Sequence, residues 1–289
     1  MDRTLAKYYL YRFGGALASR TPPRLGLPLA AWLGIVIWRL HDSARGVIEE
    51  NLSHILGPDP DPDQVRDTGR RVFQNSVKSY YHLFRRTASP AAIRGVGHVR
   101  ESLLKGKGVI LTSAHFGNFD ALWSAAASYG YPLTVPVERV RPERLFQHLL
   151  RLRSADGVRL IPVDGPLVSV RRALKRNEIV CLAADRDITQ SGTTVELFGA
   201  RAHLPDGAVR LAMRTGAPLL FGYGLHNGGS HQARVLPPLA LRDTGDPDSD
   251  LRANHRTMAR TLEAVISRHP DQWLMFTPLW RVDSPRGDG

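Results

Sequence analysis

The sequence predicts an α/β protein in which a mixed central β-sheet is flanked by helices and preceded by a helical N-terminal region. Apolar residues recur at helical spacing up to about residue 100, and after Gly106 short apolar runs alternate with helical patterns. Such alternation is typical of a sheet that carries helices on its faces. The 289 residues contain no long low-complexity linker. We therefore expect one domain over residues 1–289, with a helical part at 1–100 and an α/β core at 101–289.

The N-terminal part contains three helical stretches. The first, Leu25–Leu40, is almost entirely apolar. Apolar residues between 47 and 56 then recur at helical spacing until Gly57-Pro58 ends the pattern. After a turn at Pro58–Asp63, helical periodicity resumes over Val65–Arg86. The sequence thus predicts a group of helices before the first strand.

The core part contains strand and helix patterns in alternation. Seven apolar runs predict strands at Val109–Thr112, Leu133–Val137, Val158–Val163, Ile179–Ala183, Val195–Phe198, Pro218–Tyr223 and Trp273–Phe276. Helical patterns cover Ala121–Tyr129, Pro142–Arg153, Leu167–Arg176, Gly207–Thr215 and Leu251–His269. The segment Arg242–Asp250 is predicted to be a polar loop.

Charge and cysteine content restrict the partners. Lys and Arg number 39 against 27 Asp and Glu, a net charge of +12, which favours an anionic partner such as nucleic acid, an acidic membrane or a phosphorylated ligand. The basic residues are spread along the chain and no zinc-finger or other nucleic-acid signature occurs, so we expect no nucleic acid. The single cysteine, Cys181, excludes an intramolecular disulfide and a thiolate zinc cluster, and no metal is implied.

The chain contains no stretch that predicts a membrane-spanning helix. The longest uncharged run, Leu25–Trp38, has 14 residues and includes Pro28, whereas a span needs roughly 18–20. We also expect no cleaved signal peptide. Two tryptophans lie within Leu25–Leu40, and arginines flank it at Arg24 and Arg39. This pattern suits a helix that lies in a lipid interface, with a buried core helix as the alternative reading.

The first candidate for chemistry follows the first strong strand. His115 lies just past that strand, and Asp120 follows across a turn that contains Gly117-Asn118. Ligands gather at the carboxyl ends of strands in open α/β sheets. An imidazole with a pKa near 6.5 accepts protons at physiological pH, and a carboxylate on its second nitrogen fixes the tautomer. The same spacing recurs at His54 and Asp59, where a helix ends in a polar turn, and we interpret that pair as structural.

Five sequence blocks follow one another in a recognisable order. They are ARGVIEENL at Ala44–Leu52, the His-x4-acidic stretch Ser113–Asp120, Val137–Pro142 with Arg153 and Gly157, Ala184–Asp187 with Glu196–Gly199, and HPDQW at His269–Trp273. In these blocks the chain resembles the bacterial acyltransferases that add late acyl chains to lipid A, and the related phosphatidylinositol mannoside acyltransferases. Asp120 in place of Glu, and Asp185-Arg186-Asp187 in place of Asp-Gln-Asp, are more similar to the mannoside-lipid branch.

The resemblance implies a glycerolipid-acyltransferase-like fold and a reaction. An acyl chain would pass from a thioester, acyl-CoA or acyl carrier protein, to a hydroxyl of a glycolipid such as a phosphatidylinositol mannoside, without any further cofactor. His115 would be the general base and Asp120 would orient its ring. Backbone N–H groups around Phe116–Asn118 are the expected oxyanion donors. Acylation of a lipid A precursor or a lysophospholipid is the alternative.

The resemblance also implies a set of substrate-binding residues. Glu138 and Arg153 would form a buried ion pair or bind the polar head of the acceptor, the alternative being a solvated surface pair. Asp185 follows a predicted strand, where it and its neighbours would bind sugar hydroxyls or simply cap a turn. Arginines between 139 and 153 suit donor or lipid phosphates. The candidates are Glu138, Arg153, Asp185, Arg186, Asp187 and Glu196.

Peripheral attachment to the cytoplasmic face of the inner membrane follows from the same reading. The part at 1–100 would be membrane-associating, through Leu25–Leu40 and basic patches that attract anionic lipids. Two other classes remain open. A basic nucleic-acid-binding protein would show salt-sensitive DNA binding without turnover of an acyl donor. A Ser-His-Asp hydrolase would need a Gly-x-Ser-x-Gly motif, which the sequence lacks.

Overall fold

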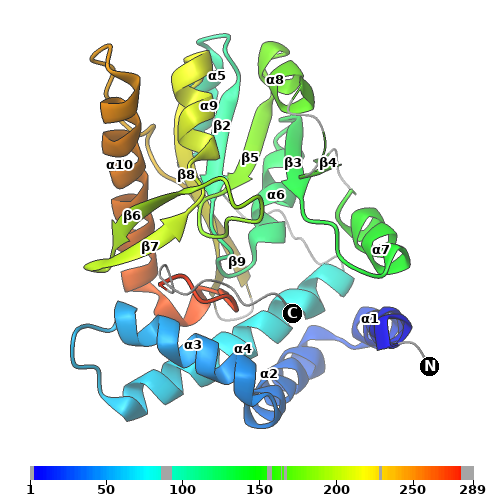
Figure 1. The fold of residues 1–289 in the computed structure, drawn as a ribbon. Coiled ribbons are helices and arrows are strands. Elements are labelled where there is room, and N and C mark those ends of the chain that lie inside the picture. The colour runs from blue at the N-terminus through cyan, green and yellow to red at the C-terminus, as the bar shows by residue number, and fades with distance from the viewer. Residues whose placement is uncertain are drawn as a thin grey trace.

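A computed structural model of the protein describes residues 3–85, 93–154, 158–163, 165, 168–227 and 230–280. It confirms the predicted fold class: helices flank a mixed seven-stranded sheet, and further helices precede it (Figure 1). Gly157, together with Arg86 and Leu167 at the ends of two predicted helices, lies outside the described residues.

Four N-terminal helices form a layer at one end of the molecule, beyond the carboxyl ends of the central strands (Figure 1). Helix α2 crosses α4 closely because small residues lie at the crossing: a Cβ on Gly34 would be 2.6 Å from the Cα of Gln74. Val72 of α4 and Leu52 of α3 then join one apolar cluster with the core of the domain. The helices are α1 (Arg3–Arg20), α2 (Pro23–Leu40), α3 (Asp42–Ile55) and α4 (Pro62–Arg85).

The large sheet has the order β1-β9-β8-β2-β5-β3-β4. Strands β8, β2, β5, β3 and β4 are parallel, whereas β9 pairs antiparallel with β8 and parallel with β1. Every residue of β2 is buried, the polar Thr112 and Ser113 included, as is typical of a central parallel strand. The strands are β1 (Ile93–Arg94), β2 (Val109–Ser113), β3 (Leu133–Val137), β4 (Val158–Pro162), β5 (Ile179–Ala183), β8 (Leu219–Asn227) and β9 (Ser230–Val235).

Two apolar clusters cover the faces of this sheet. One contains Ile110 and Val180 with residues of the α8, α9 and α10 side, and the other contains Leu111 and Cys181 with residues of α5 and α6. Burial raises the pKa of the Cys181 thiol to about 12, so this cysteine is an inert core residue. The remaining elements are α5 (Val96–Leu103), α6 (Phe119–Ser128), α7 (Glu143–Arg153), α8 (Val168–Lys175), the β6 (Thr193–Leu197) and β7 (Ala200–Leu204) hairpin, α9 (Gly207–Thr215), α10 (Pro247–Arg268) and the short helix η2 (Pro270–Gln272).

Two predictions of secondary structure are wrong. The run Trp273–Phe276 is not a strand, because Trp273 makes only an isolated antiparallel bridge with Phe116. The expected loop Arg242–Asp250 ends early, because α10 already begins at Pro247. There the side chain of Asp246 caps the helix by accepting hydrogen bonds from two backbone N–H groups.

Among the described residues, no helix is both long and apolar enough to span a bilayer.

Candidate active site

His115 lies in the loop between β2 and α6, at the carboxyl edge of the sheet. Its side chain is 32% exposed and faces a cavity of about 120 Å³. This cavity lies between the His115 loop and α4, so the N-terminal layer forms one of its walls. The lining residues are Ser76, Ser79, Tyr80, His115, Phe119, Asp120, Arg153, Leu274 and Phe276.

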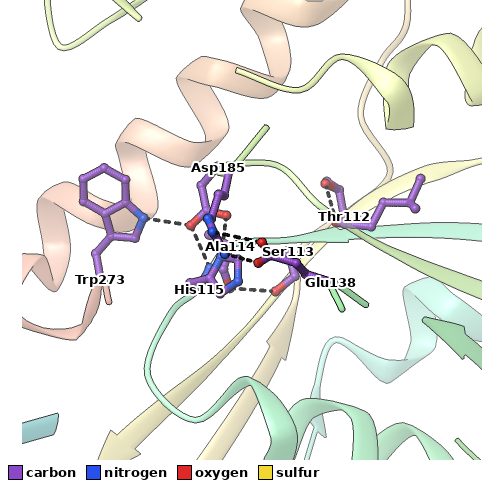
Figure 2. Close-up of polar contacts among 9 residues, drawn as sticks. Thr112, Ser113, Ala114, His115, Glu138, Asp185 and Trp273 are labelled. Atoms are coloured by element: carbon purple, nitrogen blue, oxygen red, sulfur yellow. Dashed lines mark hydrogen bonds and ion pairs between the residues drawn. The ribbon is translucent and has the colours of Figure 1, made fainter. Parts of the chain in front are cut away.

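Asp185 is the carboxylate that holds the His115 ring. Strands β2 and β5 are neighbours, with Ser113 paired to Ala183, so the residues two positions beyond each strand end meet. The Oδ1 of Asp185 lies 3.0 Å from Nδ1 of His115, and its Oδ2 accepts the backbone N–H of His115 at 2.7 Å. The Asp185 side chain is fully buried. Figure 2 shows its carboxylate between the His115 loop and the indole of Trp273.

The contact with Asp185 determines which ring nitrogen of His115 is free. A carboxylate on Nδ1 favours the tautomer with hydrogen on Nδ1, which leaves Nε2 as the nitrogen that can take a proton. Burial lowers the pKa of His115, but the charge and hydrogen bond of Asp185 outweigh it, so the pKa is raised. Burial likewise raises the pKa of Asp185, but His115 and other donors outweigh it, so this pKa is lowered. Both shifts favour a charged imidazolium–carboxylate pair.

The structure corrects the expected partner of the imidazole. Asp120 does not contact the His115 ring in the way the spacing suggested, because it lies in the first turn of α6 and forms an ion pair with Arg153. The Nε of Arg153 donates to Oδ1 of Asp120 at 2.8 Å, and the guanidinium lies over the ring of Phe119. Both charged side chains are mostly buried, at 18% and 15% exposed. The pair belongs to the cavity wall that faces His115.

Glu138 also has a partner other than the expected one. One role expected for Glu138 was an ion pair with Arg153, but Arg153 pairs with Asp120, and Glu138 accepts a 2.5 Å hydrogen bond from Nη1 of Arg186. The other expected role, binding the polar head of the acceptor, stays a prediction. Both side chains of this pair are partly exposed. The charge of Arg186 lowers the pKa of His115, as does that of Arg153. Arg153 and Arg186 therefore both lower the pKa of the imidazole, although each is paired with a carboxylate of its own.

The remaining two candidates lie away from the cavity. Asp187 is buried, and its Oδ2 accepts hydrogen bonds from the backbone N–H of Gly192 at 2.7 Å and from Nε2 of His203 at 2.9 Å. It therefore fastens its own loop to β7. Glu196 is exposed on β6 opposite Arg201. Neither residue is among those that line the His115 cavity.

Two of the expected oxyanion donors are already used. The N–H of Phe116 donates to the carbonyl of Ala114 and the N–H of Gly117 donates to the carbonyl of Gln272, each at 2.7 Å. These two hydrogen bonds hold the loop in its shape. The positive charge that borders the cavity belongs instead to Arg153.

The sequence did not reveal the residues that brace this loop. Ser79 of α4 donates to the carbonyl of Gly117 at 2.9 Å, and its hydroxyl also lies 2.9 Å from Nε2 of His226. Trp273 donates its indole N–H to Oδ2 of Asp185 at 3.0 Å. The only sequence signal for these contacts was the HPDQW block, which ends at Trp273 but does not indicate that its indole contacts Asp185.

The arrangement suits proton abstraction from a substrate. It holds an imidazole whose Nδ1 is engaged by a buried carboxylate, a small cavity, and a cation on the cavity wall. In the described residues no cluster of three or more His, Cys, Asp or Glu side chains has the geometry of a metal site.

Comparison with known proteins decides the family. Residues 2–282 match the family described as bacterial lipid A biosynthesis acyltransferase. The chain belongs to this family. Similar relatives are the phosphatidylinositol mannoside acyltransferase of Mycobacterium tuberculosis, 29% identical over 283 residues with 93% of this chain and 87% of the relative covered, and that of Mycolicibacterium smegmatis, 29% identical over 249 residues with 82% and 79% covered.

Membership of the lipid A biosynthesis acyltransferase family makes the protein an acyltransferase. It also confirms the resemblance drawn from the five sequence blocks. Three of those blocks meet in space: the His115 loop, the strand end with Asp185 and the HPDQW block contact one another directly.

Proposed function

We propose that this acyltransferase moves a fatty acyl chain from an acyl thioester, carried by coenzyme A or acyl carrier protein, to a hydroxyl of a glycolipid such as a phosphatidylinositol mannoside. The observation that carries the proposal is the imidazole of His115, which faces a cavity while buried Asp185 holds its Nδ1 at 3.0 Å. The curated relatives, which are phosphatidylinositol mannoside acyltransferases, support the choice of acceptor.

In the proposed reaction His115 works as a general base without an enzyme nucleophile. Nε2 takes the proton of the acceptor hydroxyl as its oxygen attacks the thioester carbonyl carbon. The C–S bond then breaks, and the departing sulfur takes the proton back from Nε2 and leaves as a thiol. Asp185 stabilises the imidazolium between these two steps, and general-base help of this kind is worth about 10²–10⁴ in rate.

The two arginine–carboxylate pairs would serve binding and charge stabilisation. Arg153 borders the cavity, so its guanidinium is the group that we propose to stabilise the oxyanion that forms on the thioester carbonyl. Its partner Asp120 keeps the guanidinium in place at 2.8 Å. The partly exposed Glu138 and Arg186 would hydrogen-bond polar groups of the acceptor.

A lipid acceptor requires access to a membrane, and helices α1 and α2 supply a surface for peripheral attachment. They expose large apolar side chains, including Phe13 at 73%, Leu25 at 65% and Trp32 at 59%. Such side chains on two consecutive helices suit the boundary between lipid head groups and acyl chains. Arg24 and Arg39 lie at the two ends of α2, and each basic residue near an anionic surface adds about 1 kcal/mol of attraction.

Turnover with defined substrates tests the proposal. The purified protein is incubated with acyl-CoA or acyl carrier protein thioesters and with one of three acceptors: a phosphatidylinositol mannoside, a lipid A precursor or a lysophospholipid. Mass spectrometry detects the acylated product. We expect the mannoside to be acylated. If one of the other two acceptors is acylated and the mannoside is not, that acceptor is the substrate and the proposed acceptor is wrong.

Two variants show whether the described cavity performs the reaction. His115→Ala should abolish transfer, because no other described residue on the cavity wall is an imidazole. His54→Ala should leave turnover within about twofold, because His54 stacks on Trp280 and does not line the cavity. Retention of most activity in His115→Ala, with any acceptor, would refute the proposed base.

A further inference from the structure

The buried carboxylate of Asp185 contacts Trp273 as well as His115. Its Oδ1 is occupied by Nδ1 of His115, whereas its Oδ2 accepts two N–H groups: the backbone N–H of His115 at 2.7 Å and the indole N–H of Trp273 at 3.0 Å. Trp273 itself is only 2% exposed. A buried charge is tolerated when several donors satisfy it, so each of the three contacts matters for how the carboxylate sits.

We propose that Trp273 is a positioning residue for the acyl-transfer reaction: its indole N–H fixes the rotation of the Asp185 carboxylate, so that Oδ1 meets Nδ1 of His115. This inference rests on the proposed role of His115 as the base. Trp273 acts only through Asp185 and does not line the cavity.

Backbone hydrogen bonds join the segment around Trp273 to the His115 loop and so place the indole N–H within hydrogen-bond distance of Asp185. The N–H of Leu274 donates to the carbonyl of His115 at 2.7 Å, and the N–H of Gly117 donates to the carbonyl of Gln272 at 2.7 Å. These two bonds flank the antiparallel bridge that Trp273 makes with Phe116. The indole and the imidazole are therefore held at a fixed separation, and Asp185 spans the gap between them (Figure 2).

The other charges near His115 do not substitute for this contact. The charges of Arg186 and Arg153 both lower the pKa of His115. Each has its own carboxylate, Glu138 at 2.5 Å and Asp120 at 2.8 Å. Asp185 is thus the anion that stabilises the imidazolium, and a small rotation of its carboxylate weakens that support.

The test replaces the indole N–H and compares two tryptophans. In Trp273→Phe we expect kcat to fall about tenfold, the scale of one hydrogen bond to a charged group, with KM for the thioester changed less than about twofold. Trp280→Phe is the matched control, since Trp280 is adjacent to Trp273, donates its indole N–H to the carbonyl of Leu197 and does not touch Asp185. It should keep kcat within about twofold of the parent protein.

The pKa of His115, measured by titration, tests the contact between Trp273 and Asp185 without any substrate. The ring signals of isotope-labelled His115, assigned with His115→Gln, should give a pKa above the ordinary 6.5 in the parent protein. In Trp273→Phe the pKa should move downward, towards its value in Asp185→Asn. In the double variant Trp273→Phe with Asp185→Asn, the pKa and kcat should equal those of Asp185→Asn alone, because Trp273 acts through Asp185.

Three outcomes would overturn the inference: an unchanged or higher His115 pKa in Trp273→Phe, equal losses of kcat in the two tryptophan variants, or a further loss of kcat in the double variant. If the chain turns over no thioester, the titration still decides the role of Trp273, so the two proposals fail separately. If Trp273→Phe does not fold, benzothienylalanine at position 273 keeps the bicyclic shape without the N–H. The same pKa and kcat changes are expected of it.

Discussion

Asp185 meets His115 because each residue lies two positions beyond one member of a paired couple, Ser113 of β2 and Ala183 of β5. The contact therefore exists because β5 is the neighbour of β2 in the sheet. It joins residues 70 positions apart in the chain, and it leaves Asp120, only five positions from His115, to a different partner.

Removing the charge of Asp185 should damage catalysis far more than removing that of Asp120. We expect Asp185→Asn to lower kcat by about 10²–10⁴, because an amide on Nδ1 neither stabilises the imidazolium nor secures the tautomer. Asp120→Asn keeps the His115–Asp185 contact and should lower kcat by about tenfold or less. Single-turnover acyl transfer measures both. Equal losses in the two variants would mean that Asp185 is not the partner that matters.

The pH dependence of kcat/KM should report the His115–Asp185 contact. A general base must be neutral to take a proton, so activity rises with pH through the pKa of His115. Because that pKa is raised, the acidic limb should have its midpoint above 6.5. In Asp185→Asn, burial and the two arginines remain, all of which lower the pKa, so the midpoint should move below 6.5. A parent midpoint at or below 6.5 would contradict the assignment.

The Asp120–Arg153 pair should contribute to stability as a unit. Arg153→Met leaves a mostly buried carboxylate without its cation and should cost about 2–4 kcal/mol in the free energy of unfolding, whereas the double variant with Asp120→Asn should recover about half. Arg66→Met is the control, because Arg66 and Asp63 form an exposed pair and its loss should cost less than about 0.5 kcal/mol. Urea unfolding measures all of them. Similar costs for Arg153→Met and Arg66→Met would show that burial of the pair has no effect.

Gly117 should not tolerate a side chain. Its φ is +51°, and a Cβ there would collide with the carbonyl oxygen of Gly224 in β8. We expect Gly117→Ala to cost more than about 3 kcal/mol and to abolish transfer, because the His115 loop must move away from β8. Gly130→Ala is the matched control, since Gly130 also has a positive φ but an open surrounding. It should cost about 1–2 kcal/mol, measured by thermal unfolding, and leave activity intact.

The surface of α1 and α2 should bind lipid vesicles. Trp32→Glu places a charge where we expect the head-group boundary and should weaken binding to vesicles that contain anionic lipid by about tenfold or more. Leu104→Glu is the control: Leu104 is 81% exposed, compared with 59% for Trp32, but follows α5 at the other end of the molecule (Figure 1). Flotation measures both variants. Equal effects, or binding indifferent to anionic lipid, would argue against this surface.

The sequence predicted those elements whose pattern is local. Strands β3 and β5 and helix α9 have the expected bounds, because a mainly apolar run or a clear helical period marks them. Strand β9 escaped notice because Ser230–Val235 has few apolar residues, and β1 because two residues carry no pattern. The start of α10 was missed because its cap, Asp246, looked like part of a polar loop.

The site was predictable in position but not in pairing. His115 and Asp185 were both recognised as residues beyond strand ends, yet periodicity cannot show that β5 is the neighbour of β2, since β3 and β4 come between them in the chain. Periodicity also does not reveal the partners of Arg153 and Glu138, because these pairs depend on how α7 and the loop after β5 are placed in space. Trp273 contacts Asp185 through a segment that forms no regular strand.

The bridge between Phe116 and Trp273 also has a consequence for synthesis of the protein. Strands and helices up to α9 emerge from the ribosome with the His115 loop still lacking the backbone partners supplied by Gln272 and Leu274. Domains fold as their chain appears, so most of the core can form before this loop is complete. We therefore expect the His115 loop to gain these backbone partners only after the segment that follows α10 has been translated.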